Sequence, residues 1–86
     1  MQPKLNLSLR QLEYFKTISD AGSFRGAAER LGVTQPTLTA QIATLEESLG
    51  VKLFERTRSG ATPTVAAREL MPVCHRIQEE EAQRLP

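Results

Sequence analysis

Residues 22–50 read GSFRGAAERLGVTQPTLTAQIATLEESLG and predict two helices joined by a very short turn. Ser23 is a typical helix N-cap, and Gly32 is a typical residue just past a helix end, so the first helix is expected between them. Thr34 caps the second helix, and Pro36 lies in its first turn, where the missing amide is harmless. A glycine-containing joint of this length is typical of a helix-turn-helix.

The second helix is expected over 35–49, and it has an apolar stripe spaced four, three and four residues apart: Leu38, Ile42, Leu45 and Leu49. Its opposite face is small and polar: Pro36, Ala40, Ala43 and Thr44, flanked by Thr37 and Thr39. A small outer face allows a helix to sit deep in a DNA major groove, which is about 12 Å wide. An ordinary solvated helix face is the competing interpretation, and this pattern alone leaves both open.

One further helix is expected before this pair, and it begins after Ser8. Its apolar residues recur every three positions: Leu9, Leu12, Phe15 and Ile18. Gln11 can reach back to the Ser8 amide while the Ser8 hydroxyl accepts from Gln11, which is a capping box. Gly22 is expected to end this helix.

A small hairpin and a last helix follow the pair. Residues 51–56 alternate in polarity like a strand, and 61–63 can form only a short edge strand because of their proline. Thr64 is expected to cap a helix that runs to about Arg84, where Pro72 introduces a kink or removes one hydrogen bond. This order predicts a mainly α fold: a winged helix-turn-helix of three helices plus a small two-stranded wing, followed by a long linker helix.

Composition excludes several classes of protein. The 86 residues allow one small domain, and 11 basic against 10 acidic residues argue against a binder that relies on bulk charge. A single cysteine cannot form an internal disulfide. One cysteine and one histidine cannot supply a four-ligand zinc site unless carboxylates complete it. Cys74 and His75 diverge by about 100° on a helix, so they do not form a nucleophile–base pair. We therefore expect no enzyme, no cofactor, no metal and no membrane segment, and a cytoplasmic location.

Several residues suit contacts with DNA. Gln35 can pair with adenine through two hydrogen bonds, Thr37 and Thr39 can reach a base or a phosphate, and Ala40 can contact a thymine methyl group. Ser23 lies at a helix N-terminus, where free amides favour a phosphate, although most such serines only cap their helix. In the hairpin, three basic residues against Glu55 give a local charge of +2, which suits a phosphate backbone or a solvated turn: Lys52, Arg56 and Arg58.

The chain resembles the N-terminal DNA-binding domain of LysR-type bacterial transcriptional regulators from about Leu9 to Leu70. The resemblance is carried, in order, by four patterns: Leu12-x-x-Phe15, Gly22-Ser23-Phe24-x-x-Ala27-Ala28-x-x-Leu31, Thr34-Gln35-Pro36-x-Leu38-Thr39-x-Gln41-Ile42-x-x-Leu45-Glu46-x-x-Leu49-Gly50 and Leu53-Phe54-x-Arg56. On the basis of this resemblance, we divide the chain into a leader (1–7), a winged helix-turn-helix domain (8–64) and a linker and dimerisation helix (65–86). The helix-turn-helix is expected at about 24–43 and the wing at about 51–63.

The resemblance also implies partners and site residues. Members are homodimers or tetramers that bind an interrupted inverted repeat of double-stranded DNA, and an effector ligand binds only a larger domain that this chain lacks. The implied DNA contacts are Ser23, Thr34, Gln35, Pro36, Thr37, Thr39, Ala40, Gln41, Arg56, Arg58 and Ser59. The implied dimer interface on the linker helix is Ala66, Leu70, Val73, Cys74 and Ile77.

Two positions among the implied DNA contacts depart from the family pattern. Ala40 stands where many members have arginine, and Ser59 stands where members often have a wing arginine, which here is Arg58, one residue earlier. Minor-groove insertion by the wing therefore stays open.

We predict sequence-specific binding of double-stranded DNA without catalysis, in a bacterial cytoplasm on the nucleoid. The alternative is a helical interaction module with incidental DNA affinity, in which the stripe of the last helix does the binding. That stripe spans less than two heptads, short of a confident coiled coil.

Overall fold

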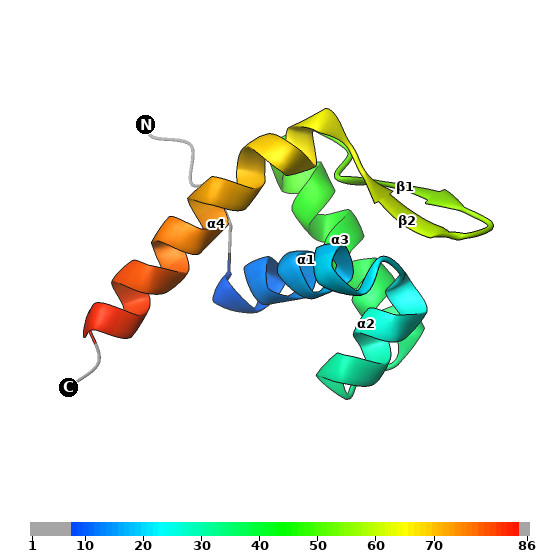
Figure 1. Ribbon diagram of the computed structural model, residues 1–86, viewed down its shortest axis with the longest axis horizontal. Helices are drawn as coiled ribbons and strands as arrows, with labels where there is room; N and C mark the ends of the chain where they lie inside the picture. Colours follow the sequence, from blue (N-terminus) through cyan, green and yellow to red (C-terminus); the bar gives the residue numbers. More distant parts are fainter. Residues whose placement is uncertain (1–7, 85–86) are drawn as a thin grey trace.

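The computed structural model describes residues 8–84, which form four helices and one two-stranded antiparallel sheet (Figure 1). In chain order the elements are α1 (Leu9–Ala21), α2 (Phe24–Leu31), α3 (Gln35–Leu49), β1 (Phe54–Thr57), β2 (Gly60–Pro63) and α4 (Val65–Arg84). The predicted mainly helical architecture, a three-helix head with a wing and a long last helix, is confirmed. The predicted leader over 1–7 and the final two residues of the predicted linker helix lie outside the described residues.

Local capping sets the helix boundaries. Ser8 and Gln11 form the predicted capping box at the start of α1, with bonds of 3.1 and 3.4 Å. The hydroxyl of Thr34 accepts from the amide of Thr37 at the start of α3. Gly32 takes the left-handed conformation that turns the chain sharply from α2 into α3. Each boundary depends on residues within one turn of the helix end, which is why the sequence predicted them.

The core lies between the three helices and the base of the wing. Most residues of the apolar stripes of α1 and α3 face it and are almost fully buried: Leu12, Phe15, Ile18, Leu38, Ile42 and Leu45. Leu9 at the start of α1 is 46% exposed, and Leu49 at the end of α3 is half-buried. Phe54 of β1 connects the wing to this core, because its ring lies 5.6 Å from Phe15 and 5.8 Å from Phe24. The wing is therefore packed onto the helices at its base.

The first strand of the wing begins later than the sequence predicted. Strand character was expected from Val51, but β1 starts at Phe54 and pairs with β2 from Phe54 opposite Pro63 to Thr57 opposite Gly60. The amides of Leu53 and Phe54 donate instead to Oε2 of Glu46 on α3, at 2.7 and 3.4 Å. A side chain thus satisfies backbone groups that a longer ladder would have paired.

Beyond its base, the wing is held against the junction of α1 and α2. The amide of Ala61 donates to the carbonyl of Gly22 at 2.9 Å. Gly60 has φ +142°, and a Cβ atom added there would overlap that same carbonyl oxygen. Glycine is therefore required at this position by both conformation and space.

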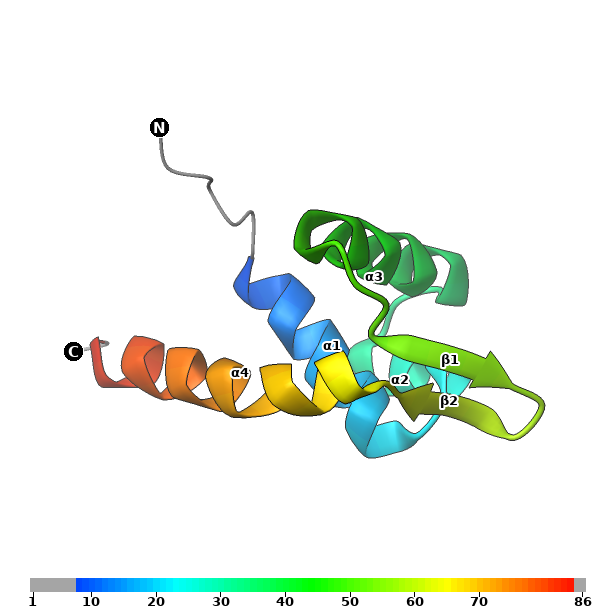
Figure 2. The same ribbon diagram turned by 90° about the horizontal axis from the view of Figure 1, so that it is seen from above.

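α4 extends from the head in the direction opposite to the wing (Figures 1 and 2). Thr64 joins its start to the segment before β1, since its hydroxyl accepts from the amide of Ala67 and donates to the carbonyl of Lys52. The helix continues through Pro72, whose missing N–H removes one intrahelical bond without ending the helix. No helix in the described part of the chain is both long and apolar enough to cross a membrane.

Candidate nucleic-acid interface

The first two turns of α3 present their outer side chains to solvent. Gln35, Pro36, Thr37 and Ala40 are exposed, while Leu38 on the opposite side is fully buried. At the N-terminus of α3 the Thr34 hydroxyl donates to the Thr37 hydroxyl at 2.8 Å. This end of the helix is free of covering side chains among the residues described, so it is accessible to a large ligand.

A surface hollow of about 380 Å³ lies between the wing and the start of α2, and we call it the wing hollow. It is lined by Ser23, Phe24, Arg25, Gln35, Arg56, Thr57, Arg58, Ser59 and Gly60. Three of these residues are arginines, and among the described residues Arg25 pairs only with the exposed Glu29, at 3.7 Å. Such a surface pair is weak, so the hollow carries positive charge that is available to an anion.

A second hollow, of about 530 Å³, adjoins the outer face of α3, and we call it the α3 hollow. Its lining residues are Gln35, Pro36, Thr39, Ala40, Ala43 and Arg56. Gln35 and Arg56 line both hollows, so the two form one continuous region on the side of the head that carries the wing.

Arg56 of β1 contacts α2 and α3 at once. Its Nη2 donates to Oγ1 of Thr39 at 2.6 Å, and its guanidinium carbon lies 3.7 Å from the centre of the Phe24 ring. The stacked arrangement combines cation–π attraction with a hydrogen bond. Arg56 was predicted to contact phosphate, and no pattern in the sequence indicated this link between wing and helix.

Ser23 has the capping role that was the simpler interpretation of the sequence. Its Oγ accepts from the amide of Gly26 at 2.9 Å, and a side chain at Gly26 would meet this same oxygen at 3.0 Å. The free end of α2 opens into the wing hollow. Capping and phosphate contact are compatible here, because the remaining amides of the first turn have no helical partner.

The structure brings most of the predicted contacts together. Eight of the eleven line one hollow or the other: Ser23, Gln35, Pro36, Thr39, Ala40, Arg56, Arg58 and Ser59. Thr34 and Thr37 lie at the N-terminus of α3 outside both hollows, and Gln41 is half-buried and lines neither. Arg25 and Ala43 line the hollows but were not predicted as contacts.

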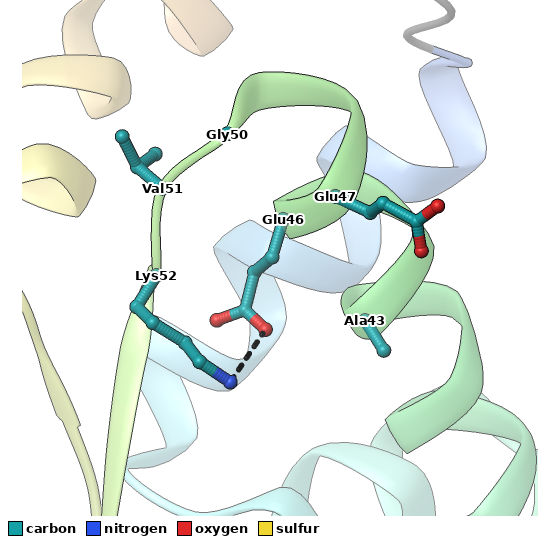
Figure 3. A pocket seen from close by; sticks show the side chains of 6 residues that line it. All are labelled: Ala43, Glu46, Glu47, Gly50, Val51 and Lys52. Atoms are coloured by element: carbon teal, nitrogen blue, oxygen red, sulfur yellow. Dashed lines mark ion pairs between the residues drawn. The ribbon is translucent and has the colours of Figure 1, made fainter.

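Glu46, toward the other end of α3, was not predicted to have a role. It borders a third hollow, of about 460 Å³, and points toward Lys52, whose Nζ lies 4.0 Å away (Figure 3). A carboxylate near a helix C-terminus is unfavourable to the helix dipole. An acidic residue at this unfavourable position could have indicated that its carboxylate has a specific partner. The partners are the amides of Leu53 and Phe54.

One predicted interface residue is located elsewhere. Cys74 was assigned to the dimer interface, but its side chain is 0% exposed and belongs to the core of the single chain. Burial raises the pKa of its thiol, which disfavours the reactive thiolate. The apolar side chains of α4 cover a wider part of its circumference than the predicted stripe. The part that includes Cys74 packs against the core of the same chain. Val73, at 45% exposed, faces solvent, and Leu70 and Ile77 are half-buried.

The described residues contain no group of three metal-ligating side chains. Cys74 is buried whereas His75 is exposed, so the two do not form a reactive pair.

Comparison with known proteins assigns the family. The model of the "bacterial regulatory helix-turn-helix protein, lysR family" matches residues 9–68, which is most of the chain. The chain is 47% identical over 62 residues to the HTH-type transcriptional regulator TfdT of Cupriavidus pinatubonensis. It is 44% identical over 79 residues to the nitrogen assimilation regulatory protein nac of Klebsiella aerogenes. The chain belongs to the LysR family of bacterial regulatory helix-turn-helix proteins, and its relatives are transcriptional regulators rather than enzymes.

Solved structures agree with this assignment. The DNA-binding domain of CbnR in complex with DNA is 39% identical, has a TM-score of 0.86, and the match covers 90% of this chain and 88% of that one. The BenM DNA-binding domain with benA site 1 DNA is 32% identical, with a TM-score of 0.83 and 90% of each chain covered. The chain is thus a LysR-type DNA-binding domain. It spans about a quarter of the length of the regulators it matches, 27% of TfdT and 26% of nac.

Proposed function

We propose that this domain binds double-stranded DNA sequence-specifically, with the N-terminal half of α3 in the major groove and the wing along the backbone or minor groove. The observation that carries the proposal is the continuous region formed by the wing and α3 hollows. It combines an exposed reading helix, arginines and a free helix N-terminus on one side of the head. The parent regulator would act on the nucleoid in a bacterial cytoplasm.

Two copies joined through α4 would place two heads on an interrupted inverted repeat. Support comes from apolar side chains that the single chain leaves exposed on this helix, Val65 at 66% and Val73 at 45%. Ala66, Leu70 and Ile77 are half-buried beside them. Removing such a surface from water favours association. Symmetric pairing of this kind matches two-fold protein symmetry to the symmetry of a palindromic site.

A first test concerns Gln35, which is exposed and lines both hollows. Duplexes recovered from a random pool supply an operator, and Gln35→Ala is then compared with the unaltered chain by gel shift on this operator and on single-base variants. We expect a loss of roughly 1–3 kcal/mol in discrimination at one position. Ser48→Ala, an exposed polar residue near the far end of the same helix, is the control. Equal discrimination in all three proteins would contradict the role of Gln35.

A further inference from the structure

The threonine hydroxyls near the outer face of α3 differ in whether their proton is already used. Thr44 donates its proton to the carbonyl of Ala40 at 3.0 Å, and Thr34 donates its proton to the hydroxyl of Thr37 at 2.8 Å. A hydroxyl has one proton and two acceptor lone pairs. Thr34 and Thr44 therefore have no proton left to offer a ligand while these bonds persist.

Thr39 is in the opposite state, as is Thr37, whose hydroxyl accepts from Thr34. Oγ1 of Thr39 accepts from Nη2 of Arg56 at 2.6 Å, and it donates to no group among residues 8–84. The direction of this bond is unambiguous, because a guanidinium has five donors and no acceptor. Arg56 occupies one lone pair of Thr39 and leaves its proton free for an acceptor outside the protein.

Arg56 is held in this position from two sides. The Phe24 ring lies 3.7 Å below the guanidinium, and Phe24 is itself packed edge-on against Phe54 at 5.8 Å. A lysine would not reproduce this arrangement, because its ammonium is a compact point charge without a planar face to stack. The geometry makes Arg56 a positioning residue that acts through Thr39.

We propose that Arg56 biases Thr39 toward hydrogen-bond donation, so that Thr39 favours bases with a major-groove acceptor and discriminates against cytosine. Arg56 fills one of the two acceptor lone pairs of the Thr39 hydroxyl and places a positive charge beside the other. This inference rests on the proposed function. Guanine, adenine and thymine each present at least one acceptor in the major groove, whereas cytosine presents only its N4 amino donor. An amino group facing Thr39 would find one lone pair already used by Arg56 and the positively charged guanidinium beside the other, which makes it a poorer partner than an acceptor.

The surroundings of Thr39 suit a base edge better than a phosphate. Thr39 lines the α3 hollow together with small side chains, Pro36, Ala40 and Ala43. These leave room for close approach to the floor of the groove. Arg25, Arg58 and the free amides at the start of α2 lie instead at the wing hollow, whereas Arg56, which lines both hollows, is engaged by Thr39 and Phe24.

The test is selection of bound duplexes from a random pool with the 86-residue chain, followed by sequencing. For the unaltered chain we expect one position at which cytosine is depleted roughly fivefold, the equivalent of one hydrogen bond. Thr39→Val and Arg56→Lys should each restore cytosine at that position and leave the other positions unchanged. Thr39→Ser keeps the hydroxyl and should keep the depletion. The double variant should add nothing to either single one.

Several results would overturn the inference. One is depletion that persists in Thr39→Val. Another is depletion that persists in Arg56→Lys together with a changed slope of affinity against salt, which would make Arg56 a phosphate contact. Thr39→Val conserves volume and carries the test if Arg56→Lys does not fold. An unaltered chain that enriches no sequence at all would overturn the proposed function itself, a result distinct from selection without cytosine depletion.

Discussion

At Gly60 the second strand of the wing meets the junction of α1 and α2. The next amide, that of Ala61, donates to the carbonyl of Gly22, and a side chain at Gly60 would overlap that oxygen. The orientation of the wing relative to α2 therefore depends on a residue without a side chain. The wing hollow, which lies between these two elements, depends on it as well.

Gly60→Ala tests this dependence. We expect the free energy of unfolding to fall by about 2 kcal/mol or more, since the variant combines φ +142° with a steric overlap. Gly50→Ala is the matched control, because Gly50 has φ +72° but no atom within 4 Å of an added Cβ. Its expected cost is about 1 kcal/mol. Equal urea midpoints for the two variants would show that the contact with Gly22 contributes nothing.

Arg56 and Thr39 illustrate how far residue-level prediction from sequence reaches. Both were predicted to contact DNA, and both line the α3 hollow. Their mutual hydrogen bond joins residues 17 positions apart and depends on where β1 passes α3. Spacing along the chain carries no information about that crossing, so the bond could not be predicted.

At the scale of elements, α3 and the wing are joined by Glu46. Its carboxylate accepts from the amides of Leu53 and Phe54, which are the residues that lead into β1. Its ion pair with the exposed Lys52, at 4.0 Å, adds little. The start of the wing is thus positioned by a side chain of α3.

Removing this carboxylate should weaken the connection. Glu46→Ala leaves the amide of the fully buried Leu53 without its acceptor, and we expect a loss of about 1–3 kcal/mol in unfolding free energy. Glu47→Ala, at the exposed neighbour, should stay within about 0.5 kcal/mol. Thermal and urea unfolding measure both, and a similar loss in the two variants would assign the effect to the helix rather than to the hydrogen bonds.

The bounds of the elements were largely predictable, and the exception is instructive. α1, α2 and α3 begin at the predicted N-cap residues and end at the predicted glycines, because capping acts within one helical turn. β1 was expected to begin at Val51 and begins at Phe54. Alternation over 51–56 is real, but the partner of the first amides is Glu46 rather than a strand.

At the scale of the whole molecule, the wing and α4 extend in opposite directions from the head (Figures 1 and 2). The surfaces proposed for DNA and for a second copy therefore lie on different parts of the molecule. Formal charges follow the same division, with 8 basic and 6 acidic residues over 1–60 against 3 basic and 4 acidic over 61–86. The net charge of +1 is therefore the sum of +2 over residues 1–60 and −1 over residues 61–86.

Association through α4 is tested best at a residue that the core does not need. Val73→Glu places a charge at a side chain that is 45% exposed, and we expect sedimentation to shift from dimer to monomer. His75→Glu is the control: it introduces the same group on an exposed position about 160° around the helix. If both variants dissociate the dimer, the cause is a general charge effect. If neither variant does, this face is not the interface.

The sequence by itself determined the order of the elements, the helix ends and the apolar faces, because caps and periodicity act over a few neighbouring residues. It also carried enough of the family's motifs to identify the domain. Only the tertiary structure decided which polar groups meet and which part of an apolar arc is covered. Arg56 reaches Thr39, Glu46 reaches the amide of Leu53, and Cys74 enters the core. These outcomes depend on the angles and separations at which packed elements cross, and no local pattern in the chain encodes them.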